Sequence, residues 1–370
     1  RLLGAIAPPL ILFAIVRAFL HAKVERGTAP KLAALLLLNT TVAIVIGMAV
    51  ANIIRPGDHA QLTPHETHAA SKGAADPLTQ FLDNVPKSVL GPLTDEGKVL
   101  SVILLAIAFG LALRRSRDAP MRSVADLVDV GFNTMLTILH WVIQVIPFGV
   151  FGIVASIVGT KGFSDFKALG VFVITVLVAL ALHTVYYLIR IRFWSWPRPL
   201  YVLRGMRDAL VMAFSTASST ATMPVTYARL RDNVKLREES ASLGALVGAN
   251  FNNDGTALYE AVSALFIAQM LGMELTLTQQ LMVVLTSIAA SVGAAGIPEA
   301  GLVTMTLVFK AVGLPVEYIA ILLTVDWFLD RCRTTVNVMG DINVSCILDG
   351  KTPGPATSVT PKLSPNMNSG

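Results

Sequence analysis

The chain has 370 residues, of which 54% are hydrophobic and only 14% are charged. A soluble domain typically carries about 25% charged residues, so this composition excludes an ordinary soluble enzyme. The formal net charge is +5, and we interpret it through the position of basic residues in loops rather than as a signal for binding nucleic acid. Two cysteines exclude a disulfide scaffold, and their spacing gives no sign of a zinc site.

Long apolar stretches follow one another along most of the sequence, and at about 20 residues per crossing they supply roughly eight to ten membrane segments. They cover 2–20, 33–54, 78–113, 124–158, 168–189, 209–228, 241–272, 279–312 and 315–348. Several contain clusters of Gly, Pro, Ser or Asn, which predict broken or re-entrant helices. We therefore expect an all-α, multi-pass protein embedded in the lipid bilayer of the cell (inner or plasma) membrane.

Basic residues crowd three of the intervening segments, around 114–122, 190–207 and 229–237. The positive-inside rule predicts that these are cytoplasmic loops and that the loop at 56–76 faces outside. The tail after Asp349 is rich in Pro, Ser, Asn and Lys, which predicts disorder.

Two segments, 209–225 and 281–312, have the pattern of a half-helix, a short Ser/Thr-rich or Gly-rich turn, and a second half-helix. Each precedes a segment with a polar centre, 250–256 after the first and 326–341 after the second. Matched interrupted segments in two halves of a chain point to the substrate site of a transporter built from inverted repeats.

The last apolar segment carries polar side chains at helical spacing. At 100° per residue, five of them share one narrow face of a single helix, whereas Arg331 points about 140° away. The five are Asp326, Asp330, Arg333, Asn337 and Asp341. Charged groups at membrane depth are costly and typically face a pathway or a partner. The alternative is an ion-pair network that locks the helix bundle, since Asp330 and Arg333 can pair.

Three motifs carry a family resemblance. They are Asn-x-Asp-Gly-Thr at 252–256, Gly-Ala-Ala-Gly-Ile-Pro at 293–298, and Asp-x-x-x-Asp-x-x-Arg-Thr-x-x-Asn-Val-x-Gly-Asp at 326–341. They resemble the glutamate transporter family, which comprises excitatory amino acid transporters and prokaryotic glutamate/aspartate symporters, and the resemblance covers essentially the whole chain. It implies a homotrimer that works by an elevator movement. Each protomer is expected to have the glutamate-transporter fold with inverted repeats, eight transmembrane helices and two re-entrant helical hairpins, with the first helix missing before Arg1.

The resemblance also implies a scaffold and a mobile transport domain. Scaffold and trimerisation helices with the outer loop are expected at 1–76, where the second helix is partly scaffold and the third lies on the transport-domain side. Further scaffold helices are expected at 77–158, and a transport-domain helix with a cytoplasmic loop at 159–208. The transport core at 209–349 then holds the first hairpin, a broken helix, the second hairpin and the last helix. A disordered tail is expected at 350–370.

Substrate contacts are carried over residue by residue. Arg333 matches the arginine that binds the side-chain carboxylate of an acidic substrate, which suits the fork geometry of a guanidinium. Asp330 matches the residue that takes the amino group, and Asn337 the one that holds the main-chain carboxylate. The other expected substrate-binding residues are Ser219, Thr256, Ile297, Gly301 and Thr334. Asp326 and Arg331 are expected to add secondary charge, and Arg331 together with Ala217 at the first hairpin tip resembles the animal-type arrangement.

Sodium ions are the coupled ions that the resemblance implies, and no cofactor is implied. The expected sodium ligands are Asn39, Thr40, Gly248, Asn250, Asn252, Asp254, Ser291, Val292, Ala294, Asn337 and Asp341. The chain departs from the family pattern at three of the surrounding positions. Asn250 stands where the family has threonine, Asn253 where it has methionine, and Leu36 where it has tyrosine. The number of sodium ions therefore stays open.

Glu260 is an isolated carboxyl in an apolar helical run, where desolvation disfavours its charged form. The resemblance makes it a proton-binding residue, and the alternative is a protonated glutamate with a purely structural role. The expected function is secondary active transport of aspartate or glutamate, coupled to sodium and in this interpretation to protons. A proton-coupled carrier of dicarboxylates or acidic amino acids and a substrate-gated anion channel are the alternatives. We expect no enzymatic activity and no nucleic-acid partner.

Overall fold

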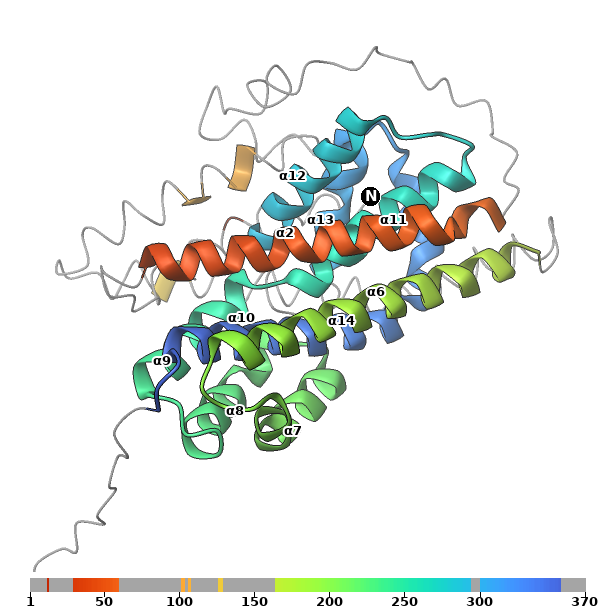
Figure 1. Ribbon diagram of the computed structural model, residues 1–370. Helices are drawn as coiled ribbons and strands as arrows, with labels where there is room; N and C mark the ends of the chain where they lie inside the picture. Colours follow the sequence, from red (N-terminus) through yellow and green to blue (C-terminus); the bar gives the residue numbers. More distant parts are fainter. Residues whose placement is uncertain are drawn as a thin grey trace, which may run out of the picture.

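The computed structural model describes residues 12, 29–59, 101–103, 106–107, 126–128, 164–293 and 300–353. The elements in these ranges are all helical, as predicted (Figure 1). In chain order they are α2 (Ala29–Ile54), η1 (Pro56–His59), α6 (Ser164–Trp194), α7 (Pro199–Thr216), α8 (Ser219–Asp232), α9 (Glu238–Ser242), η3 (Leu243–Val247), α10 (Gly248–Phe251), α11 (Asp254–Met270), α12 (Leu277–Gly293), α13 (Ala300–Ala311), η4 (Val316–Tyr318) and α14 (Ile319–Asp349). Most of the expected scaffold at 77–158 and the end of the tail lie outside the described residues.

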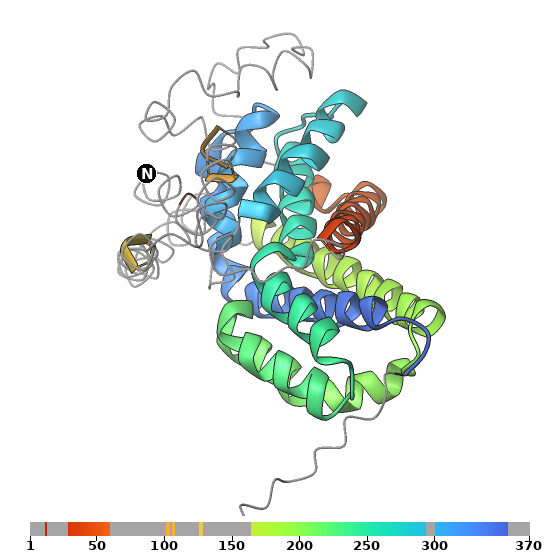
Figure 2. The same ribbon diagram turned by 90° about the vertical axis from the view of Figure 1, so that its left-hand side faces the viewer.

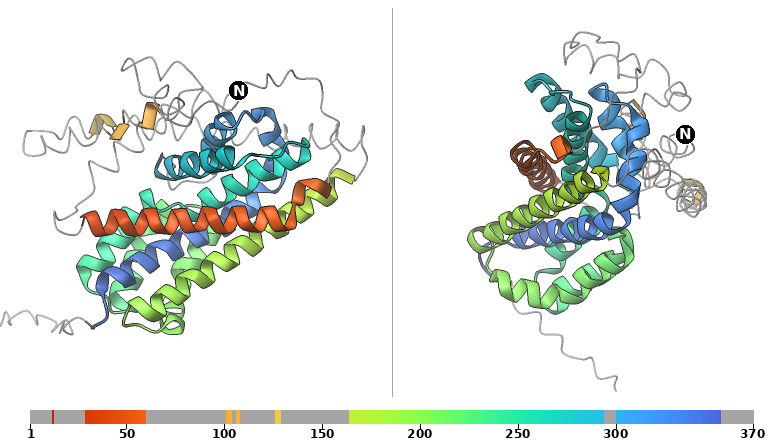
Figure 3. Two further views of the ribbon diagram at one scale, coloured as in Figure 1. Left: turned by 45° about the horizontal axis from the view of Figure 1, so that its top comes forward. Right: turned by 90° about the vertical axis from the view of Figure 1, so that its right-hand side faces the viewer.

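Two stretches in the described part of the chain, Pro30–His59 and Ala168–Trp194, are long and apolar enough to cross a membrane. They correspond to α2 with η1 and to α6, and α6 packs along both α2 and α14 (Figure 3). Both helices also expose large apolar side chains, such as Ile53 on α2 and Ile174 and Ile189 on α6. Exposed apolar surface of this extent suits contact with lipid rather than with water.

The basic segment at 190–207 is not a continuous loop, and this part of the loop prediction is wrong. Helix α6 continues to Trp194, so Arg190 lies inside it and is buried, with 3% of its surface exposed. Arg204 and Arg207 belong to α7. The apolar segment predicted at 168–189 ended too early because arginine is strongly polar on any hydropathy scale. A membrane helix can nevertheless contain an arginine where other helices cover it.

Helices α7 and α8 form a pair around the Ser/Thr-rich turn predicted at 209–225. Ala217 ends α7 in the left-handed conformation (φ 50°), and its N–H donates to the carbonyl of Ala213 at 3.0 Å. Ser218 then caps α8, its hydroxyl accepting from the N–H of Ala221 at 3.1 Å. The pair packs against one side of α14, and the pair α12–α13 lies on the other side (Figure 2).

The polar segment at 250–256 interrupts a helix, as the pattern predicted. Helix α10 ends at Phe251, and α11 begins at Asp254 after two residues with non-helical backbone, Asn252 (φ −108°, ψ 76°) and Asn253 (φ −107°, ψ 50°). Almost every residue of α11 is buried, because α2, α12, α13 and α14 all pack on it. Backbone groups freed at such a break need partners inside the protein.

Candidate functional site

Arg333 lies at the centre of a buried ion-pair cluster on α14. It is completely buried, and its guanidinium donates from Nη1 to Asp326 Oδ1 at 2.8 Å and from Nη2 to Asp330 Oδ1 at 2.7 Å. The guanidinium carbon also lies 3.9 Å from the centroid of the Tyr259 ring on α11, which is a cation–π contact. The predicted common face of 326–333 is thus confirmed, and Tyr259 is a member that sequence analysis missed.

The start of α13 approaches this cluster closely. A Cβ atom placed on Gly301 would lie 3.5 Å from Nη1 of Arg333 and 3.0 Å from the methyl group of Thr256. Thr334 is buried on α14, and Ser219 at the start of α8 donates to the carbonyl of Ala249 at 3.1 Å. Of the expected substrate-binding residues, Ile297 lies outside the described part of the chain.

Asn337, one turn further along α14, hydrogen-bonds to the start of α11, directly after the break in the helix. Its Oδ1 accepts from the N–H of Gly255 at 2.8 Å, and its Nδ2 lies 3.3 Å from the Thr256 hydroxyl and 3.4 Å from Asn253 Oδ1. Asn253 in turn donates to the carbonyl of Ser291 on α12 at 3.1 Å. Asn253 entered the sequence analysis only as a departure from a family pattern, and the structure includes it in the site.

Asp341, Asn252 and Gly248 form a second polar group beside the first. Asn252 Nδ2 donates to Asp341 Oδ1 at 3.2 Å and to the backbone carbonyl of Asn337 at 3.1 Å. Its Oδ1 is buried and has no hydrogen-bond partner among the residues described here. A Cβ on Gly248 would lie 2.3 Å from Asp341 Oδ1, so the glycine backbone runs directly beside the carboxylate. A carboxylate, an unused amide oxygen and a close backbone are a donor set that fits a small hard cation such as sodium.

The other expected sodium ligands are spread around these groups. The hydroxyl of Ser291 is buried without a hydrogen-bond partner in the described structure, and Val292 is half-buried beside it. Ala294 lies outside the described residues. Asn250 is half-buried, and its amide donates to the carbonyl of Leu246 on its own helical stretch at 3.1 Å, so its contact joins none of the other ligands.

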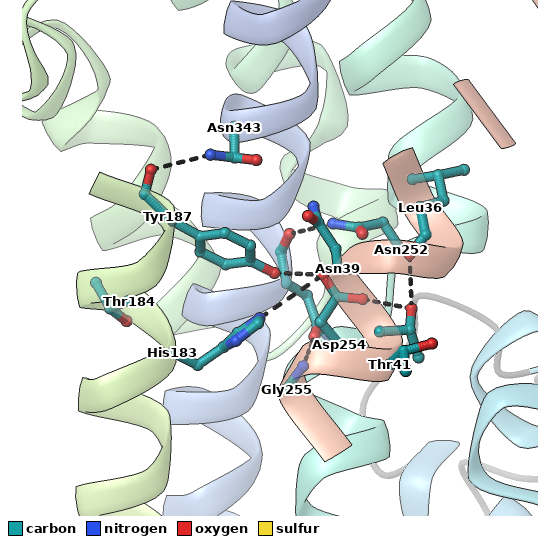
Figure 4. Close-up of polar contacts among 12 residues, drawn as sticks. Leu36, Asn39, Thr41, His183, Thr184, Tyr187, Asn252, Asp254, Gly255 and Asn343 are labelled. Atoms are coloured by element: carbon teal, nitrogen blue, oxygen red, sulfur yellow. Dashed lines mark hydrogen bonds and ion pairs between the residues drawn. The ribbon is translucent and has the colours of Figure 1, made fainter. Parts of the chain in front are cut away.

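A third polar group surrounds Asp254, where α11 meets α2 and α6 (Figure 4). Thr40 donates to its Oδ1 at 2.6 Å, Tyr187 donates to its Oδ2, and Nε2 of His183 lies 4.0 Å from Oδ2. Asn39, one residue before Thr40, accepts a hydrogen bond from Arg190.

Sequence analysis missed the three α6 residues, although the signal was present. His183, Tyr187 and Arg190 are spaced by four and three residues in an apolar segment, which puts them on one helix face.

Arg331 and Glu260 lie outside these three groups. Arg331 donates to the carbonyls of Ser215 at 2.7 Å and Phe214 at 3.2 Å, so it binds the carboxyl end of α7, where a cation is favourable. Glu260 is completely buried in α11. Thr304 of α13 donates to its Oε1, and its Oε2 has no hydrogen-bond partner in the described part of the chain.

Apolar helices that enclose an ion-paired arginine, buried oxygens without hydrogen-bond partners and a broken helix indicate a membrane protein with an internal cluster of polar groups. The sequence profile described as the Sodium:dicarboxylate symporter family matches residues 1–351, and the chain belongs to this family. Membership confirms the family prediction and the multi-pass membrane class.

Curated relatives point the same way. The chain is 40% identical over 263 residues to an excitatory amino acid transporter of Caenorhabditis elegans, covering 70% of this chain and 52% of the relative. It is 38% identical over 255 residues to excitatory amino acid transporter 3 of Oryctolagus cuniculus, covering 68% of this chain and 48% of the relative. It is also 38% identical over 258 residues to excitatory amino acid transporter 5 of Homo sapiens, covering 68% of this chain and 45% of the relative. The chain therefore spans about half the length of the curated relatives it matches.

Proposed function

We propose that the protein is a secondary active transporter of acidic amino acids, aspartate or glutamate, driven by sodium ions. The observation that carries this proposal is the completely buried Arg333 held between two carboxylates inside an apolar bundle. The family description names sodium and dicarboxylates, and relatives at 38–40% identity are called excitatory amino acid transporters.

The ion pairs of Arg333 suggest how such a substrate binds. An amino acid with two carboxylates offers one to the guanidinium and its ammonium to Asp330, so each group of the existing pair gains a new partner. The Nε of Arg333 has no hydrogen-bond partner among the described residues, which leaves a donor for the incoming carboxylate. A Cβ on Gly301 would lie only 3.0 Å from the Thr256 methyl group, so the backbone at the start of α13 lies directly against this cluster. We assign Thr256, Ser219, Thr334 and Ile297 to the walls of the same site.

Charge arithmetic supports coupling to cations. With both carboxylates ionised, Asp326, Asp330 and Arg333 sum to −1, and an acidic amino acid adds −1, giving −2 in a buried site. Net charge buried at membrane depth is strongly unfavourable, so co-bound cations stabilise the loaded state. Asp341, Asn252 and the backbone of Gly248 would hold one sodium ion, and Ser291, Val292 and Ala294 would contribute to another.

The larger arrangement follows the family pattern in our proposal. The helices of 209–349 pack on one another around α14, which suits a transport core that moves as a unit against a scaffold. We propose that this elevator movement takes place in a homotrimer. Glu260 would carry a coupled proton, since it is buried and its Oε2 has no partner in the described structure.

Uptake of radiolabelled aspartate into proteoliposomes tests the proposal, with the sodium gradient and the pH gradient imposed separately. We expect an inward sodium gradient to drive accumulation, and unlabelled glutamate to compete where neutral amino acids do not. Accumulation that is indifferent to the sodium gradient would contradict sodium coupling, and competition by neutral amino acids as strong as that by unlabelled aspartate would contradict the substrate class.

A further inference from the structure

The carboxylate of Asp254 is already satisfied by protein side chains. Thr40 donates to one oxygen at 2.6 Å. The Tyr187 hydroxyl donates to the other, and His183 Nε2 lies 4.0 Å from that same oxygen (Figure 4). Asp254 and His183 are completely buried. One hydrogen bond is thus donated to each carboxylate oxygen, so a sodium ion at Asp254 would have to share these oxygens with the Thr40 and Tyr187 hydroxyls or displace one of them.

The neighbouring expected ligand, Asn39, is bound to a permanent cation. Its Oδ1 accepts a hydrogen bond from Nη1 of Arg190. The guanidinium is held over two aromatic rings, 5.5 Å from the centroid of Tyr186 and 5.1 Å from that of Trp194. An arginine does not lose its charge in a protein. The amide oxygen expected to bind sodium therefore already carries a positive partner.

The surroundings of Asp341 differ from those of Asp254 and Asn39 both in hydrogen bonding and in charge. The ion pairs found among the described residues include none to Asp341, and the adjacent Asn252 Oδ1 has no hydrogen-bond partner there. Asp341 accepts a hydrogen bond from Asn252 Nδ2 at 3.2 Å while the Oδ1 of that same amide stays available, whereas Asp254 accepts from both Tyr187 and Thr40.

We infer that the site formed by Asn39, Thr40 and Asp254 holds no sodium ion, because Tyr187 and Arg190 of α6 already donate hydrogen bonds to Asp254 and Asn39 and Arg190 places a permanent positive charge beside Asn39. This inference rests on the proposed function and deepens it, since it reduces the number of coupled sodium ions by one. The family pattern at this site does not fit the residues present. Two like unit charges about 5 Å apart at an effective dielectric constant of about 20 weaken binding of the second by on the order of 100-fold.

Sodium alone is the probe that tests the inference without relying on aspartate. A ligand that binds only the folded state raises the unfolding temperature with its concentration. The purified full chain is therefore titrated with sodium chloride against choline chloride while thermal unfolding is followed. We expect Thr40→Val and Asp254→Asn to keep the wild-type apparent sodium affinity within about twofold, whereas Asp341→Asn loses most of the sodium response.

A gain-of-site variant provides the converse test. Arg190→Leu combined with Tyr187→Phe frees the oxygens of Asn39 and Asp254, so we expect an additional sodium-dependent rise in unfolding temperature. The matched control is Arg192→Leu, which removes an exposed arginine from the same helix and should leave the sodium titration unchanged.

The inference would be overturned by a folded Thr40→Val variant that loses the sodium response as Asp341→Asn does. If Asp254→Asn does not fold, Thr40→Val still decides the test. Failure of wild-type protein to bind aspartate at any sodium concentration would instead overturn the proposed function, and the sodium titrations would still decide the inference.

Discussion

Replacing Arg333 with cysteine removes the guanidinium that Asp326 and Asp330 share. If this group binds the side-chain carboxylate of the substrate, the variant loses one partner of a buried charged contact, which typically costs about 2–5 kcal/mol, or about 30- to 4,000-fold in affinity. The complete burial of Arg333 and its 2.7 and 2.8 Å contacts place the expected loss of aspartate affinity in the upper half of this range. Small neutral amino acids should bind better than aspartate in the variant.

The same substitution leaves two buried carboxylates facing each other, so folding must be measured beside binding. Loss of one partner of a buried ion pair destabilises a protein by about 3–5 kcal/mol. Isothermal titration with aspartate and with alanine gives the affinities, and thermal unfolding gives the stability. Arg333→Lys is the matched control, because it keeps the charge and the stability but lacks the planar fork that binds a carboxylate in two hydrogen bonds. A folded Arg333→Cys protein with wild-type aspartate affinity would refute the assignment.

Three further changes have defined outcomes. Asp341→Asn should weaken the dependence of aspartate binding on sodium without altering the order of preferred substrates, and a wild-type sodium titration at saturating aspartate would remove Asp341 from the cation site. Gly248→Ala places a methyl group 2.3 Å from Asp341 Oδ1, so it should destabilise the protein by about 1–3 kcal/mol and weaken its stabilisation by sodium. Thermal unfolding measures both effects, and an unchanged sodium titration would contradict a role of Gly248 in the cation site. Glu260→Gln should abolish aspartate uptake driven by an imposed pH gradient while homoexchange continues, and a variant that keeps its full response to the gradient would leave Glu260 with a structural role only.

The face of α14 was predictable because helical periodicity is a local property. Asp326, Asp330 and Arg333 follow 100° spacing, and no knowledge of other helices is needed to put them together. The break at 252–253 was predictable for a similar reason, since several amide side chains in an apolar run favour a freed backbone. Both features were confirmed by the structure.

The residues that α6 contributes to the polar group around Asp254 could be predicted only in part. Periodicity places His183, Tyr187 and Arg190 on one face, but it does not say that this face meets Asn39 on α2 and Asp254 on α11. That pairing depends on which helices pack together, and the information lies in tertiary contacts rather than in spacing.

The sequence could not predict which asparagines in 250–253 belong to the site, for a different reason. Asn250 is still helical, and its side chain bonds to Leu246 one turn earlier. Asn253 lies within the break, where the helical phase no longer holds, and its amide donates to the carbonyl of Ser291 on α12. A rotation of backbone angles at two residues thus decides which asparagine enters the site, and no residue count along the chain can supply those angles.

Asn337 gives the two proposed ligands a physical route to influence each other. Its side chain contacts Gly255 and Thr256 beside the Arg333 cluster, while its backbone carbonyl accepts from Asn252, the residue that also donates to Asp341. A sodium ion that takes the free oxygen of Asn252 fixes the orientation of that amide, and the amide then fixes the stretch of backbone that carries the Asn337 side chain. Substrate bound at Asn337 orders the same amide from the opposite direction. Coupling through one shared residue is reciprocal, with typical magnitudes of about 1–3 kcal/mol, so sodium should raise aspartate affinity by the same factor, about 5- to 150-fold, by which aspartate raises sodium affinity.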